Sequence, residues 1–177
     1  MEASTSKLAT ISRTSWEIRT TSLKAYTTPS DYAELGQPSQ YFFGAYCQAP
    51  GKMFLAYFSS RSAAVLTQAI LANGRRGLQA TVPMQEVAVA EIANIVTNAV
   101  AATLADRCGM SFVLSAPKLV RGARADVIRS AFGDLHSVGK IFSASIHLSS
   151  KDIAADCTLM MMLDDLIVHF VLNALDR

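Results

Sequence analysis

Two polar side chains three residues apart, Glu91 and Asn94, are the strongest candidates for chemistry in this 177-residue sequence. They lie inside a long apolar run that begins near Pro83 and ends at Gly109, and such a run predicts a helix. Residues three apart project from the same side of a helix, so a carboxylate and an amide can act together on one target. A Glu-x-x-Asn pair is also common on exposed helices, where it simply sits in solvent.

The predicted helix over residues 84–106 has two arcs of different character. One arc is made of larger apolar residues and is expected to face the core. The other is made of small residues with a carboxylate and two amides among them, a surface that another helix or loop can approach closely. The core arc comprises Ile92, Ile95, Val96, Ala99, Val100 and Thr103, and the opposite arc comprises Ala90, Ala93, Thr97, Ala101 and Ala105, together with Val87, Glu91, Asn94 and Asn98.

A proline stands at a fixed distance from this pair, because 22 residues separate Asn94 from Pro117. The combination of Glu91, Asn94 and Pro117 resembles the signature of the CheC/CheX/FliY family of bacterial chemotaxis phosphatases: Asp or Ser, three residues, Glu, two residues, Asn, 22 residues, Pro. Val87 stands where that signature has Asp or Ser. CheC-like members carry two such motifs and this chain carries one, so it is most similar to CheX.

The resemblance implies an activity: removal of phosphate from the aspartyl phosphate of a CheY-like response-regulator receiver. It implies that Asn94 positions the hydrolytic water and that Glu91 pairs with a receiver lysine. An amide suits the first task because it both donates to and accepts from water. We expect the chain to have no cofactor or metal of its own, and we expect Mg²⁺ on the partner receiver. The residues expected to set how closely the receiver docks are Val87, Ala90, Asn98 and Ala101.

Turn residues and alternating patterns predict the elements around the helix. The pattern predicts a hairpin, with strands over 40–48 and 52–58 joined by a turn at Ala49-Pro50-Gly51. It also predicts a following helix over 63–72, which Ser59 or Ser60 can cap. Residues 140–148 and 153–163 read as a second hairpin, followed by a helix over 165–175. Residues 110–115 read as a short strand, the first 27 residues carry a weak helical pattern, and 118–139 are hard to interpret.

The strand-turn-strand-helix order therefore occurs twice, at 40–73 and 140–175. Each unit has an apolar face too small to stand alone, so we expect both to share one sheet. The predicted fold is α+β: two pseudo-repeated units forming a shared, mainly antiparallel sheet covered by helices, as in CheC and CheX. We expect a single CheX-like domain over 1–177, with an N-terminal helix and connector in 1–39 and the core in 40–177. The resemblance to CheX also implies a homodimer joined through sheet edges.

Charge and composition exclude several classes of protein. The 16 Lys and Arg against 14 Asp and Glu leave a net charge of +2 with no concentrated basic face, so we expect no nucleic-acid partner. The most apolar stretch, 158–175, is interrupted by Asp164 and Asp165, so we expect no membrane span. Three widely spaced cysteines, Cys47, Cys108 and Cys157, indicate free thiols in a reducing cytoplasm.

Two other functions stay open at this point. The first is a catalytically weak or inactive receiver-binding protein of the same fold, similar to the flagellar-switch components FliM and FliY, because a fold does not fix a function. The second is an unrelated dimeric ligand-binding α+β domain, for which we would expect a deep apolar pocket and a buried Glu91–Asn94 pair.

Overall fold

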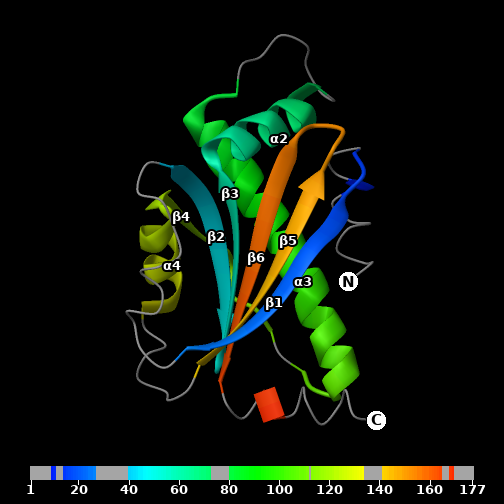
Figure 1. Cartoon of the computed structure of the whole chain (residues 1–177), viewed down its shortest axis with the longest axis vertical. Coiled ribbons are helices and arrows are strands. Elements are labelled where there is room, and N and C mark those ends of the chain that lie inside the picture. Colours follow the sequence, from blue (N-terminus) through cyan, green and yellow to red (C-terminus); the bar gives the residue numbers. More distant parts are fainter. Residues whose placement is uncertain are drawn as a thin grey trace.

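The computed structural model describes residues 9–10, 14–26, 40–72, 80–111, 113–133, 141–164 and 168–169 of the chain. These residues form a single six-stranded sheet with helices on both faces (Figure 1). The elements in chain order are β1 (Glu17–Tyr26), β2 (Tyr41–Ala49), β3 (Lys52–Ser59), α2 (Ser60–Ala72), α3 (Val82–Cys108), β4 (Lys118–Ala123), α4 (Arg124–Phe132), β5 (Ile141–Ser150) and β6 (Ala155–Asp164).

The sheet has the strand order β1-β5-β6-β3-β2-β4, and every neighbouring pair is antiparallel. The two predicted hairpins are present as β2–β3 and β5–β6. They meet at the centre of the sheet, where β3 pairs with β6 and Met53 lies opposite Met162. The prediction of two strand pairs sharing one mainly antiparallel α+β sheet is therefore confirmed.

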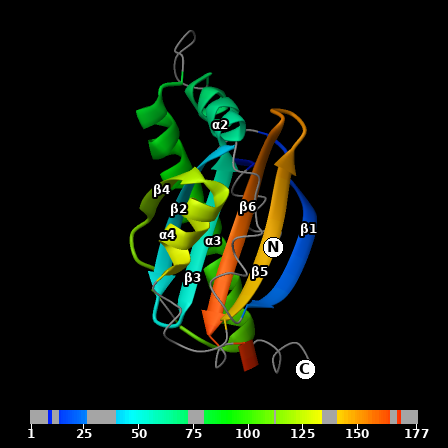
Figure 2. The same ribbon diagram turned by 60° about the vertical axis from the view of Figure 1, so that its left-hand side comes forward.

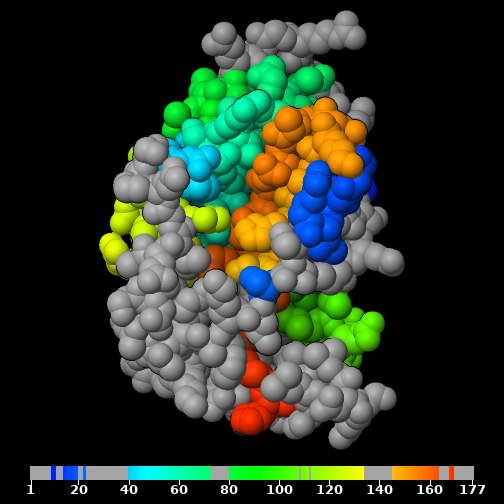
Figure 3. Space-filling view, viewed as in Figure 1, coloured from blue at the N-terminus to red at the C-terminus, as the bar shows by residue number. Residues whose placement is uncertain are grey.

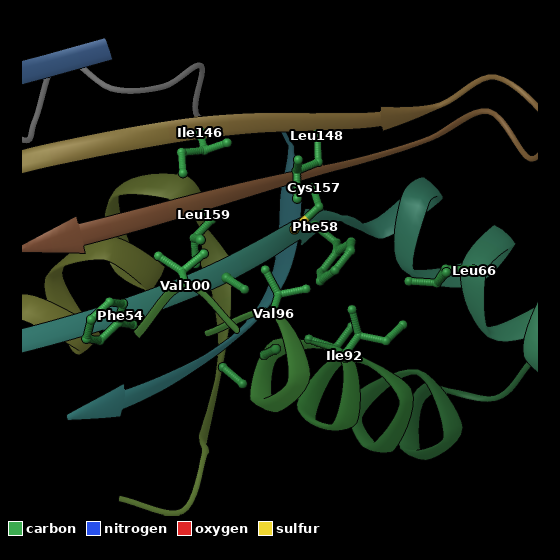
Figure 4. Close-up of a cluster of buried hydrophobic side chains, with 14 of the residues drawn as sticks. Phe54, Phe58, Leu66, Ile92, Val96, Val100, Ile146, Leu148, Cys157 and Leu159 are labelled. Carbon is green, nitrogen blue, oxygen red and sulfur yellow. The ribbon is translucent and has the colours of Figure 1, made fainter. Parts of the chain in front are cut away.

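Helices α2 and α3 cover one face of the sheet, and α4 covers part of the other (Figure 2). Alternate residues of β3 divide between the two faces, as the pleat of a strand requires. Phe54, Ala56 and Phe58 pack toward α2 and α3, whereas Leu55 and Tyr57 pack toward α4. Figure 4 shows Ile92, Val96 and Val100 of α3 beneath the strands, within the first of these two cores.

The N-terminal prediction was wrong over residues 17–26, which form strand β1 instead of a helix. This strand pairs along its length with β5 at the edge of the sheet, and Figure 3 shows β1, β5 and β6 together on the surface. Ser15, just before β1, donates from its backbone N and its Oγ to Asp152 Oδ2, each at 2.7 Å. Pairing with residues more than 100 positions away outweighs a weak local helical pattern that is rich in Ser and Thr.

Three other regions differ from the predicted elements. The segment that was hard to interpret contains β4 and α4, both short. The strand expected at 110–115 is absent from the described part of that segment, although the Ser115 N–H donates to Gln48 O at 2.9 Å. Of the helix expected at 165–175, only residues 168–169 are described, and they are helical. The connector predicted over residues 27–39 lies outside the described residues.

Candidate functional site

Helix α3 carries the predicted pair, and its ends follow the signals in the sequence. Pro83 lies in its first turn, where a missing N–H costs nothing. Gly109 ends it in the left-handed conformation at φ 61°, with its N–H donating to Ala105 O. Between these ends, Val89, Ile92 and Val96 are fully buried against the sheet. Rigid packing of this kind fixes which side of the helix reaches solvent.

Length and apolar composition alone would allow α3 to cross a membrane. The structure gives that composition another explanation, because half of the most apolar stretch of α3 is buried inside the fold. Val96 and Val100 pack among the strands as part of the main core (Figure 4). Helix α3 is therefore the central core helix of this fold.

The small residues of α3 face a different direction from the one predicted. Ala93 and Thr97 are fully buried and Ala101 is 5% exposed. Thr97 Oγ1 donates to Ala93 O at 2.7 Å and lies 3.6 Å from Cys47 Sγ on β2. The expected arc was wrong for these three residues, because small side chains allow α3 to approach the sheet closely. Ala101 thus packs within the core instead of on the exposed face.

The exposed side of α3 is a narrow strip, and it contains the candidate pair. Glu91 is exposed and points away from the core, while Asn94 is half-buried one turn further on. The neighbouring Val87 is 69% exposed, the highest value among the large hydrophobic side chains of this helix. We define the α3 ridge as Val87, Ala90, Glu91, Asn94 and Asn98, of which Ala90 is half-buried and Asn98 exposed.

Asn98 holds the side chain of Asn94. The Asn98 Nδ2 donates to the backbone O of Asn94 at 2.7 Å and to its Oδ1 at 2.8 Å. Side-chain hydrogen bonds of this type join residues four apart on a helix surface. Sequence reasoning placed Asn98 on the ridge but missed this contact, although the i, i+4 spacing of two asparagines was a visible signal.

Glu91 is free to meet a partner. Within the described part of the chain, its carboxylate has no hydrogen bond and no ion pair. An exposed carboxylate on a rigid helix can accept hydrogen bonds from a lysine of another protein without first breaking a contact of its own. The condition expected for a ligand-binding domain, a buried Glu91–Asn94 pair, is not met.

An apolar groove lies on one side of the ridge, between α2 and α3. Its volume is about 400 Å³, and Val87 and Glu91 belong to both the groove and the ridge. The groove is lined by Thr67, Ile70 and Leu71 of α2 and by Pro83, Met84, Val87, Ala88 and Glu91 of α3. A partner that docks on the ridge therefore meets an apolar surface beside the carboxylate.

Strand β4 is joined to α3 by a salt bridge. Arg121 Nη1 of β4 lies 2.8 Å from Glu86 Oε1 of α3. Pro117 comes directly before this strand, which pairs with β2 at the edge of the sheet. The proline of the sequence signature thus lies where the chain enters β4, and it has no contact with Asn94 among those that the structure shows.

The remaining reactive groups lie away from the ridge. Burial raises the pKa of the Cys157 thiol, and it raises that of Cys47 despite a hydrogen bond from Thr97. Both are free and buried, as predicted, whereas the side chain of Cys108 lies outside the described residues. His147 Nδ1 lies 2.9 Å from Thr158 Oγ1 on the sheet. In the described part of the chain, no three His, Cys, Asp or Glu side chains are grouped so that they could hold a metal ion.

Comparison with known proteins shows which solved structures share the fold of this chain. No family model and no curated protein matches the sequence. Among solved structures, Thermotoga maritima FliY is 12% identical with a TM-score of 0.71, covering 97% of this chain and 87% of its own. The FliM middle domain of Vibrio alginolyticus is 10% identical with a TM-score of 0.63, covering 98% and 93%. The CheX–CheY–BeF3–Mg²⁺ complex from Borrelia burgdorferi gives 13% identity and a TM-score of 0.55, covering 92% and 94%. The resemblance to CheC, CheX and FliY proteins is thus confirmed at the level of the fold, which this chain shares with FliY, FliM and CheX.

Proposed function

We propose that this chain binds a phosphorylated, CheY-like receiver through the α3 ridge and hydrolyses its aspartyl phosphate. The observation that carries the proposal is the placement of Glu91 and Asn94 on the exposed strip of a helix whose other sides are buried. A CheX protein of the same fold has been solved with CheY, BeF3 and Mg²⁺. A receiver is therefore the partner best suited to this ridge.

The proposed reaction is a water-driven displacement at phosphorus. The water oxygen bonds to phosphorus, the bond from phosphorus to the aspartyl oxygen breaks, and a water proton passes to the released phosphate. The products are a free aspartate on the receiver and inorganic phosphate. The receiver supplies its own Mg²⁺, so this chain contributes positioning rather than a cofactor.

Asn94 positions the attacking water. Placing water in line with the breaking bond removes an entropic part of the barrier. The Asn94 Oδ1 accepts one hydrogen bond from Asn98 and keeps a lone pair for a water proton. The Nδ2 of Asn94 has no acceptor in the described part of the chain and can donate to water, and an amide does not compete with water as a nucleophile.

Glu91 anchors the receiver by pairing with one of its lysines. The pair forms at the centre of the docking surface, where water is excluded and a charge-assisted hydrogen bond is stronger than in solvent. Val87, Ala90 and Asn98 set how closely the receiver approaches. Ala101 has no part in this docking surface because it lies in the core.

The direct test is phosphate release from a receiver charged with acetyl phosphate, measured with and without this chain. The receivers to use are those of the same cell. We expect the chain to accelerate release in proportion to its concentration. An unchanged rate of release with every receiver, combined with measurable binding, would instead favour the second function below.

The second function is a receiver-binding, flagellar-switch-like protein without activity. The FliY of T. maritima and the FliM middle domain of V. alginolyticus have higher TM-scores to this chain than the CheX complex does, and Val87 replaces the Asp or Ser of the phosphatase signature. The same docking surface would serve this function. Only hydrolysis separates the two, and the release assay measures it.

Two further expectations belong to the proposal: the chain acts in the cytoplasm, and it forms a homodimer through sheet edges. Strands β1 and β4 are the edges of the described sheet, and an exposed edge offers unpaired backbone groups to a second copy. Light scattering in solution tests the second expectation, and the mass of a single chain would contradict it.

A further inference from the structure

Hydrogen-bond chemistry fixes the orientation of both ridge amides. The backbone O of Asn94 can only accept, so the Asn98 atom 2.7 Å from it must be the Nδ2 donor. That Nδ2 has no lone pair to offer, so the Asn94 side-chain atom 2.8 Å away must be the acceptor Oδ1. The Nδ2 of Asn94 consequently takes the other position on the amide. A backbone carbonyl thus determines which way two successive side-chain amides face.

We infer that Asn98 is a positioning residue, which acts on the reaction by holding the Asn94 amide in one orientation. This inference rests on the proposed function, since it concerns the residue assigned to the attacking water. It gives Asn98 a second role, which acts through Asn94, besides its place on the docking surface. The Nδ2 of its amide donates to two oxygens of Asn94, whereas its own oxygen has no hydrogen-bond partner among the described residues.

An unheld asparagine is poorly suited to orient water. Its terminal torsion is broad and roughly two-fold, so oxygen and nitrogen exchange places at little cost. In one orientation Asn94 presents an acceptor to a given water site, and in the other it presents a donor. Asn98 selects one of these before the receiver arrives, so the amide needs no reorganisation during the reaction.

The test combines two variants at Asn98 with a matched control. Asn98→Ala removes the donor, and Asn98→Asp keeps the shape but places an acceptor against the Asn94 backbone O. We expect kcat for phosphate release to fall about tenfold or more in both, with KM within about twofold of wild type. Asp106→Asn, an exposed change on the same helix, should leave both constants unchanged. A rise in KM at constant kcat would overturn the inference, because it would show that Asn98 contributes to docking alone and not to the reaction through Asn94.

A double-mutant cycle tests whether Asn98 acts through Asn94. In the Asn94→Ala background, Asn98→Ala should cause no further loss of kcat. An additional loss as large as the one in the wild-type background would overturn the inference. Neither alanine threatens folding, because alanine is the best helix former and both sites lie on the solvent side of α3.

A measurement without activity separates this inference from the proposed function. Side-chain ¹⁵N relaxation of the Asn94 amide should report restricted motion in the wild-type chain and faster motion in Asn98→Ala. Equal mobility in the two proteins would overturn the positioning role. Absence of phosphate release from the wild-type chain would overturn the proposed function while this relaxation result still decides whether Asn98 holds Asn94.

Discussion

Replacing Asn94 by Ala should separate stability from activity. The substitution removes one exposed side-chain hydrogen bond, the contact of 2.8 Å with Asn98, worth about 0.5 kcal/mol on a helix surface. Alanine gains about 0.6 kcal/mol in helix propensity over asparagine. The backbone O of Asn94 still accepts from Asn98 and from Thr97. The two free energies nearly cancel, so the melting temperature should stay within about 2 °C of wild type.

The activity of Asn94→Ala should fall far more than its stability. Loss of one group that is pre-positioned at the reacting centre costs roughly 3 kcal/mol of the barrier, or about a hundredfold in rate. The assay follows phosphate release from a charged receiver, with calorimetry on the same variant to show that binding persists. Decay as fast as with the wild-type chain would refute the role of Asn94. A large drop in melting temperature would refute the placement of its side chain on the solvent side.

The remaining predictions concern docking and pH. Glu91→Lys should weaken binding of an activated receiver at least tenfold in calorimetry, since a lysine would face the receiver's lysine. Asp106→Lys makes the same charge change on the same helix and should leave the affinity unchanged. Equal losses of affinity in the two variants would argue against specific pairing of Glu91. Val87→Glu should weaken binding about fivefold, or roughly 1 kcal/mol, because a charge replaces an exposed apolar contact at the edge of the groove; unchanged affinity would remove Val87 from the docking surface. Burial, together with the positive charge of Arg124, lowers the pKa of His147 below its ordinary 6.5. The unfolded chain therefore binds a proton more readily, so this contribution to stability is present above pH 6.5 and is lost as the pH falls through the lowered pKa. Urea unfolding should show a loss on acidification that is smaller in His147→Gln, and identical pH profiles would contradict this.

Local sequence signals were sufficient where an element depends on its own residues. The β2–β3 turn at Pro50-Gly51, the cap of α2 and the end of α3 at Gly109 were all predicted, and the structure has them. Ser59 Oγ, for example, accepts from the Ser62 N–H at 3.1 Å. Each of these features is decided within a few residues, so a single sequence contains the information.

Strands at the two edges of the sheet were not predictable in the same way. Strand β1 pairs with β5, which lies more than 100 residues away in the sequence. The residues near Glu17–Tyr26 contain no local signal that predicts this pairing. Strand β4 has only six residues, and one of them, Gly122, has a φ of 147°. Such a short segment shows too little alternation of apolar and polar residues to be recognised as a strand from the sequence. Their stability comes from tertiary contacts, which override local propensity.

The place of Glu91 and Asn94 on α3 was predictable from the sequence, but the packing of the small residues around them was not. The spacing of Glu91 and Asn94 correctly placed both on one side of α3. The burial of Ala93, Thr97 and Ala101 was missed because alanine and threonine fit either a tight core contact or a bare surface. Only the tertiary packing distinguishes these two environments, since the apolar residues of α3 surround most of the helix.

An NMR titration of the ¹⁵N-labelled chain with a receiver activated by BeF3 and Mg²⁺ would show whether the α3 ridge binds the activated receiver. We predict that the largest changes in backbone and side-chain amide signals fall on Val87, Glu91, Asn94 and Asn98, and that they are absent with the unactivated receiver at the same concentration. Changes confined to β1, β5 and β6, with the α3 ridge unaffected, would rule out the ridge as the docking surface for the receiver.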